Sequence, residues 1–155
     1  MIDVAVNFLH LLATSVWIGG ALFIHLVLQP SLGAIEPPQA GKLYGVIAKR
    51  FSIAAWISII ILLFTGLYKT PAGMLFDTSS ETGTTLMIKH VLVLIVVAVG
   101  LVIGLVVVPR LRKAAPAPGE KPSEKFLGYQ KQLTLLSSTN TLLAMGILIC
   151  ASMLW

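Results

Sequence analysis

Long apolar runs alternate with short polar segments along the chain. Four such runs occupy residues 4–28, 51–68, 86–108 and 133–155. The hydrocarbon core of a bilayer is about 30 Å thick, and a helix needs about 20 apolar residues to cross it. We therefore predict four transmembrane helices. Joined by short polar segments, they would form an all-α integral membrane four-helix bundle with up-down-up-down topology and a single domain over residues 1–155.

Prolines and polar segments set the expected helix ends. Pro30, Pro37 and Pro38 are expected to close the first helix and delay the second, and Pro109 is expected to end the third, because proline lacks an amide hydrogen and clashes with the preceding turn. Amphipathic segments at 40–50 and 123–132 are expected to extend the second and fourth helices, the latter from a serine N-cap. Residues 70–85 are rich in glycine, serine and threonine and are expected to form an irregular loop. No internal repeat is evident in the sequence.

The distribution of charge predicts the orientation of the helices. Only 11% of the residues are charged, against 57% that are hydrophobic, and the net charge is +5. Nine basic residues lie in the first and third connecting segments, whereas Lys69 and Lys89 flank the second. Basic loops stay in the cytoplasm, so both termini are expected outside the plasma (inner) membrane. The basic loops then contact lipid headgroups, and no nucleic-acid partner is predicted.

Several functional classes lack support in the sequence. It has no glycine-rich phosphate loop, nucleophile elbow or metalloprotease motif. No carboxylate lies inside an apolar run, which argues against an ion pump driven by carboxylates. The single cysteine, Cys150, cannot form an intrachain disulfide.

Two histidines lie at matching positions in the first and third apolar runs. His10 and His90 are each about one turn inside, which places both at the same depth in the outer half of the membrane. A titratable side chain in a membrane helix marks a functional site by default. The two runs are parallel and are often diagonal neighbours in a compact bundle, so the imidazoles could ligate one haem iron from both sides.

This pair predicts a b-type haem protein in electron transfer or redox chemistry. Trp17 follows His10 by one heptad, on nearly the same helix face. Lys89 adjoins His90, where its ammonium group either reaches the headgroups or pairs with a haem propionate. The predicted cofactor-binding residues are therefore His10, Trp17, Lys89 and His90. A quinone or an outer-side redox partner would complete the reaction, and the protein would be a membrane oxidoreductase of unspecified reaction.

A second hypothesis is a copper site. Met87 precedes His90 by three residues on the same helix surface, and thioether and imidazole ligands suit Cu(I). The ligand set would be His10, Met87 and His90, in a copper-binding or copper-transport module. A third hypothesis is a membrane subunit or assembly factor without a cofactor, and an oligomer is compatible with all three. His25 has no counterpart in the third run, and we expect it to bond to a polar residue of the fourth.

Short motifs along the chain resemble known membrane protein families. The stretch from His10 through Trp17-Ile-Gly-Gly to Phe23 is similar to the first helix of the copper resistance D (CopD) family. The similarity continues in Lys89 and in three further motifs: Arg50-Phe51-Ser52, Thr65-Gly66-Leu67-Tyr68 and Val108-Pro109-Arg110-Leu111. This resemblance covers nearly the whole chain. It implies copper handling in the outer compartment by a minimal, four-span member of the family.

His10, the Trp-Gly-Gly motif and Lys89 also resemble the HemJ-type membrane protoporphyrinogen oxidases, which share a four-helix scaffold and bind haem b. That resemblance implies haem, with His10 and Lys89 as the matched positions. The chain departs from the HemJ pattern because it lacks a histidine late in the third run, and this departure counts against the oxidase reaction.

Overall fold

The structure, a computed structural model, describes residues 1–74, 78–117 and 120–154. Helices and short connecting segments make up this part of the chain, which contains no strand. Four helices are long and apolar enough to cross a membrane: Ile2–Ala34, Pro37–Lys69, Glu81–Lys113 and Glu124–Ser152. The predicted all-α fold with four membrane spans is confirmed. Each helix begins before its apolar run, because polar and amphipathic residues continue the same hydrogen-bonded ladder. Trp155, at the end of the fourth run, lies outside the described residues.

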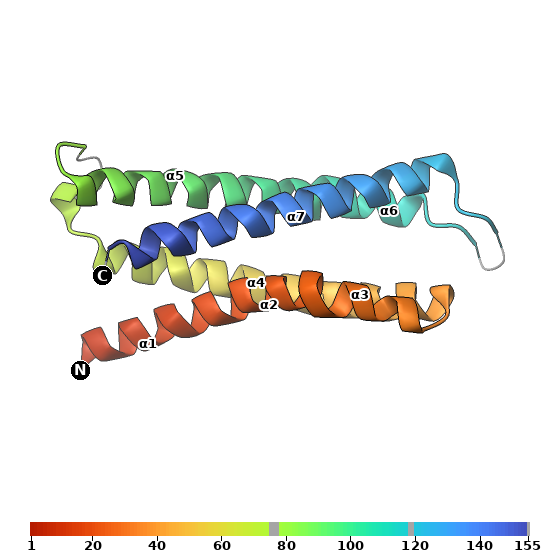
Figure 1. The fold of residues 1–155 in the computed structure, drawn as a ribbon, viewed down its shortest axis with the longest axis horizontal. Coiled ribbons are helices and arrows are strands. Elements are labelled where there is room, and N and C mark those ends of the chain that lie inside the picture. Colours follow the sequence, from red (N-terminus) through yellow and green to blue (C-terminus); the bar gives the residue numbers. More distant parts are fainter. Residues whose placement is uncertain (75–77, 118–119, 155) are drawn as a thin grey trace. The chain divides into compact units, whose positions relative to one another are not determined.

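The chain divides into two compact units, residues 1–75 and 76–155. The first unit is a helical hairpin, whose first rod runs without a break through α and π-helical segments. These are α1 (Ile2–Thr14), η1 (Ser15–Gly19), α2 (Gly20–Phe23), η2 (Ile24–Leu28) and α3 (Gln29–Ser31), followed by the 3-10 turn η3 (Leu32–Ala34). The rod packs antiparallel against α4 (Pro37–Lys69) (Figure 1). A further 3-10 turn, η4 (Ala72–Met74), follows this hairpin.

The second unit is also a helical hairpin. Its segments are α5 (Glu81–Val102), η5 (Ile103–Val107), α6 (Val108–Lys113) and α7 (Glu124–Ser152). The rod formed by the first three packs along α7 (Figure 1). Val96 and Val107 are its most deeply buried side chains, and Ala144 of α7 is buried with them. The organisation of both hairpins as a single domain over residues 1–155 stays a prediction.

Serine side chains cap the starts of both helices of the second hairpin. Ser123 Oγ accepts a hydrogen bond from the Phe126 amide at 3.2 Å, as predicted for an N-cap. Ser80 Oγ accepts one from the Gly83 amide at 3.0 Å. Because this cap starts α5 at Glu81, the expectation of an irregular loop through residue 85 is wrong for its last turn.

Pro30 and Pro109 do not end their helices, which corrects the prediction from the sequence. Each proline lies two residues after a π-helical turn, η2 in the first rod and η5 in the second. In such a turn the amide bonds to the carbonyl five residues back. The wider turn moves away the carbonyl group four residues back, which the proline ring would otherwise strike. It also shifts the hydrogen-bond pattern at the point where proline has no amide hydrogen, so both helices continue.

The same device occurs at equivalent places in the two hairpins, although no repeat is evident from the sequence pattern alone. Both first rods are 33 residues long. The same number of residues separates three features of the first rod from their counterparts in the second: the first residue, the late π-helical turn and the proline. Residues 22–32 also match residues 101–111 at six positions: Leu22 and Leu101, Ile24 and Ile103, Leu26 and Leu105, Val27 and Val106, Pro30 and Pro109, Leu32 and Leu111. The late part of the first rod, from the π-helical turn to the residues after the proline, is therefore similar in the two hairpins.

A glycine of α2 leaves space for an aromatic ring of α4. A Cβ atom added to Gly20 would collide with the ring of Phe51, with Cδ2 at 3.0 Å and Cε2 closer still. The neighbouring Gly19 has no atom within 4 Å of the equivalent position. Of the two glycines, only Gly20 leaves space for the Phe51 ring of α4.

Candidate functional site

The His10 ring is held across the interface of the first hairpin. Its Nδ1 atom lies 2.6 Å from Oγ1 of Thr65 on α4. The Thr65 hydroxyl donates its own proton to the Ile61 carbonyl at 2.7 Å. Thr65 Oγ1 is therefore the acceptor and His10 Nδ1–H the donor, which leaves the lone pair of the neutral imidazole on Nε2.

Further contacts tie down the backbone around His10. The Thr14 hydroxyl donates to the His10 carbonyl at 2.8 Å. Gly66 lies beside the ring, and a Cβ atom added there would be 3.8 Å from His10 Cε1. Farther toward the helix ends, the Tyr68 hydroxyl donates to Asp3 Oδ1 at 3.1 Å. Two polar contacts thus join the ends of α1 and α4 on this side.

The His90 ring has the same tautomer for a different reason. Its Nδ1 atom lies 2.7 Å from the Leu86 carbonyl oxygen, one turn back on α5. A carbonyl can only accept, so Nδ1 carries the proton and the Nε2 lone pair is available. Histidines that ligate metals commonly donate their other nitrogen to a backbone carbonyl in this way. The ring of the half-buried His90 is therefore held by its own helix with Nε2 as the acceptor nitrogen.

The other predicted site residues lie in different surroundings. Met87 is 40% exposed, three residues before His90 on α5. Lys89 is half-buried. Trp17 is buried within η1, so the heptad spacing that related it to His10 no longer follows an uninterrupted α-helix. His10 and Trp17 belong to the first hairpin and the other three residues to the second, and the pairing of His10 with His90 stays a prediction.

The two histidines lie at similar positions along their helices. His10 is eight residues after the first residue of its span, and His90 is nine residues after the first residue of its own. At 1.5 Å per residue these positions are about 12 and about 14 Å from the helix starts. The interval that relates the two prolines matches His10 to Lys89, one position before His90.

His25 has a hydrogen-bond partner that the sequence analysis missed. Its Nδ1 atom lies 3.2 Å from Oε1 of Gln29, one turn later in the same rod. Gln29 Nε2 in turn donates to the Tyr44 hydroxyl of α4 at 3.4 Å. The spacing of four residues between His25 and Gln29 could have indicated this contact. The expected bond to the fourth span stays untested.

The described residues include the three histidines and Cys150. No group of three histidine, cysteine, aspartate or glutamate side chains there is close enough to hold a metal ion.

Thr65 is the other residue that sequence reasoning missed. Nothing in its spacing from His10 indicates the contact, because the register between two helices is set by packing.

Comparison with known protein families gives a match to the family described as Copper resistance protein D, over residues 45–154. The chain belongs to this family. The matched region of this CopD-family protein contains Met87, Lys89 and His90 but begins after His10 and Trp17. The resemblance to the CopD family is confirmed, whereas the one to the HemJ-type oxidases stays a prediction.

One curated relative is an uncharacterized protein of Aquifex aeolicus (strain VF5), 36% identical over 64 residues. The match covers 41% of the CopD-family chain and 44% of the relative, so the chain spans less than half the length of that relative. No solved structure gives a significant match.

Proposed function

We propose that this CopD-family membrane protein binds Cu(I) as its cargo, with His90 and Met87 of α5 at the centre of the ligand set. The observation that carries the proposal is the 2.7 Å hydrogen bond from His90 Nδ1 to the Leu86 carbonyl. It fixes the imidazole in the tautomer that presents Nε2 to a metal. The family match supports copper over the alternative of haem b.

The second ligand follows from the helix geometry. Residues three apart on an α-helix have Cβ atoms about 5–6 Å apart on one face. The Met87 thioether and the His90 imidazole can therefore converge on one ion. Both are ligands that suit a soft cation such as Cu(I). Half-exposure of Met87 leaves its sulfur accessible to an incoming ion.

His10 is the third proposed ligand. The Thr65 hydroxyl holds it in the same tautomer as His90, and it lies at a similar distance from the start of its span. The positive-inside rule places these helix starts at the outer face of the plasma membrane. Copper would then be received from the outer compartment.

Titration of the purified, detergent-solubilised protein with Cu(I), under anaerobic conditions against a chromophoric Cu(I) chelator, tests this proposal. We expect one tightly bound Cu(I) per chain, with affinity at least tenfold lower in His90→Ala and Met87→Leu. Met145→Leu is the matched control, because Met145 of α7 is 39% exposed and Met87 is 40% exposed. Equal affinity in all three variants would contradict the proposed site.

An absorption spectrum of the same preparation separates copper from haem. The two Nε2 lone pairs would also suit a bis-histidine haem iron. A Soret band that is lost in His10→Ala and His90→Ala, together with no Cu(I) binding, would replace copper by haem b as the ligand. With neither ligand bound, the protein would instead be a cofactor-free membrane subunit or assembly factor.

A further inference from the structure

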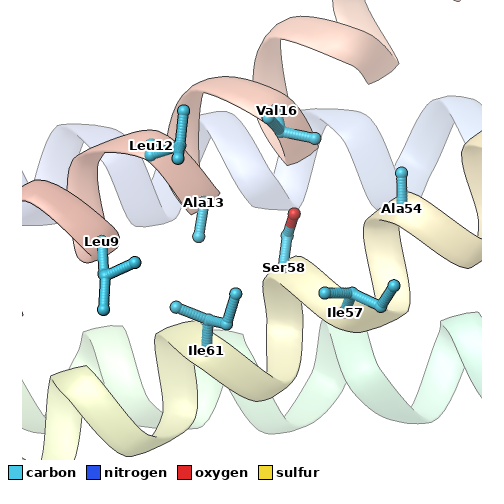
Figure 2. A pocket seen from close by; sticks show the side chains of 8 residues that line it. All are labelled: Leu9, Leu12, Ala13, Val16, Ala54, Ile57, Ser58 and Ile61. Atoms are coloured by element: carbon cyan, nitrogen blue, oxygen red, sulfur yellow. The ribbon is translucent and has the colours of Figure 1, made fainter.

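The first hairpin contains an apolar groove that the proposed copper site does not use. Its volume is about 250 Å³. All of its lining residues come from α1, η1 and α4: Leu9, Leu12, Ala13, Val16, Ala54, Ile57, Ser58 and Ile61 (Figure 2). Seven of the eight side chains are hydrocarbon. The groove is therefore a place for a lipid-soluble molecule with very few polar groups.

The one polar side chain of the groove is a buried hydroxyl without a partner. Ser58 is only 4% exposed, and its Oγ atom points from α4 toward α1 (Figure 2). Among the described residues it has no hydrogen-bond partner. Thr65 of α4 and Ser15 of η1, by contrast, donate to the carbonyl four residues back.

A polar group in hydrocarbon without a partner costs free energy. Donation to a carbonyl in the preceding turn is the usual way in which a helical serine avoids this cost. Ser58 makes no such bond among the described residues, and its Oγ atom faces the groove instead. The hydroxyl is therefore placed to donate to an acceptor that enters from outside the hairpin.

The depth of Ser58 limits what that acceptor can be. Ser58 lies eleven residues before the end of α4 at Lys69, which is about 16 Å along the axis. The apolar run of α4, residues 51–68, is about 27 Å long and matches the hydrocarbon core, which is about 30 Å thick. Ser58 lies seven residues after the start of this run, so its hydroxyl is about 10 Å inside the hydrocarbon. The ester carbonyls of phospholipids remain at the boundary, so the acceptor belongs to a molecule that enters the core.

The rim of the groove has an open side. Four of the lining side chains are 40% to 54% exposed: Leu9, Leu12, Val16 and Ile57. Ala13 and Ser58 are buried at its floor. A ring can therefore lie against Ala13 and Ser58 while an attached hydrocarbon tail leaves across the exposed rim.

We infer that the groove binds the head ring of a lipid-soluble quinone, with one ring carbonyl accepting a hydrogen bond from Ser58. The floor supplies the single donor that a quinone carbonyl needs, and the volume suits one substituted six-membered ring. The hydrocarbon walls exclude charged molecules. This inference is independent of the copper proposal, because it uses none of the copper ligands.

Quenching of tryptophan fluorescence by decylubiquinone tests the inference on the full chain in phosphatidylcholine nanodiscs. Trp17 adjoins Val16 and Trp56 adjoins Ile57 in the sequence, so two of the three tryptophans flank groove residues. We expect saturable quenching for the natural protein. Ser58→Ala should weaken quinone affinity about three- to tenfold, the effect of one lost hydrogen bond, and Ser58→Thr should retain it. Ala54→Leu, which places a larger side chain in the groove, should abolish saturation.

Matched controls keep the test decisive. Ser15→Ala removes a hydroxyl that already donates to the Leu11 carbonyl, and it should bind quinone like the natural protein. An excess of methyl decanoate, an ester with a similar chain, should not displace the quinone. Wild-type affinity in Ser58→Ala, non-saturable quenching of the natural protein, or equal displacement by the ester would each overturn the inference. Thermal unfolding of every variant separates loss of binding from loss of fold.

Discussion

The hydroxyl of Thr65 accepts the Nδ1 proton of His10 across the interface of α1 and α4, with 2.6 Å between the two atoms. The contact does two things at once. It joins the helices of the first hairpin inside the membrane, and it decides which nitrogen of the imidazole carries the lone pair. Thr65 thus orients the His10 ring for the ligand role that we propose for it.

Replacement of Thr65 by valine removes this acceptor without changing the shape of the side chain greatly. The half-buried Nδ1–H then lacks its partner, at a cost of about 1–3 kcal/mol. We expect a lower unfolding temperature and, if His10 binds Cu(I), an affinity about tenfold lower, because the partners that orient ligands commonly contribute 10–100-fold. Thr65→Ser should restore both. Thr85→Val is the control, since the Thr85 hydroxyl bonds only to Glu81 of its own helix; an equal loss there would contradict a specific role for Thr65.

Adjacent glycines should respond differently to the same substitution. Gly20→Ala places a methyl group into the Phe51 ring and should destabilise the protein by about 1–3 kcal/mol, the usual cost of overpacking. Gly19→Ala meets nothing within 4 Å and should be neutral or slightly stabilising in a helix. Thermal unfolding in detergent measures both. Relief of the Gly20→Ala loss by Phe51→Leu would confirm that the ring is the cause, and equal losses at both glycines would contradict this packing.

Met87 and Lys89 both precede His90 on α5, and they would contact different ligands, Met87 a Cu(I) ion and Lys89 a haem propionate. For Cu(I), Met87→Leu removes a thioether ligand and should lower affinity at least tenfold, whereas Lys89→Met should have little effect. For haem, Lys89→Met should weaken cofactor retention through a lost propionate contact of about 1.5–3 kcal/mol, and Met87→Leu should be nearly silent. Parallel Cu(I) titrations and absorption spectra of the two variants distinguish these outcomes.

Labelling of single cysteines tests the predicted orientation. In a Cys150→Ser background, Thr78→Cys lies between the two hairpins and Ala115→Cys lies in the basic segment of the second. A membrane-impermeant maleimide added to intact cells should label Thr78→Cys alone, because the basic segments are predicted to be cytoplasmic. Labelling of Ala115→Cys alone would invert the topology and place the His10 and His90 ends of the helices inside.

The membrane spans could be predicted from the sequence because span length is a property of each helix by itself. The serine cap at Ser123 is equally local. The contact of His10 with Thr65 could not, since it depends on the register between two helices. The prediction that Pro30 and Pro109 end their helices was wrong because π-helical turns cannot be recognised in the hydrophobic pattern.

The wide turns before Pro30 and Pro109 have a consequence for how these two rods can change. Each extra residue in a π-helical turn rotates everything beyond it by about 100° around the helix axis. The part of each rod that carries the histidine and the part that carries the proline can therefore have different rotations about the helix axis, relative to the neighbouring helix. A one-residue insertion or deletion at η2 or η5 would be taken up locally as a gain or loss of one wide turn. The directions in which His10 and His90 leave the helix axis therefore do not depend on changes at the far ends of their helices.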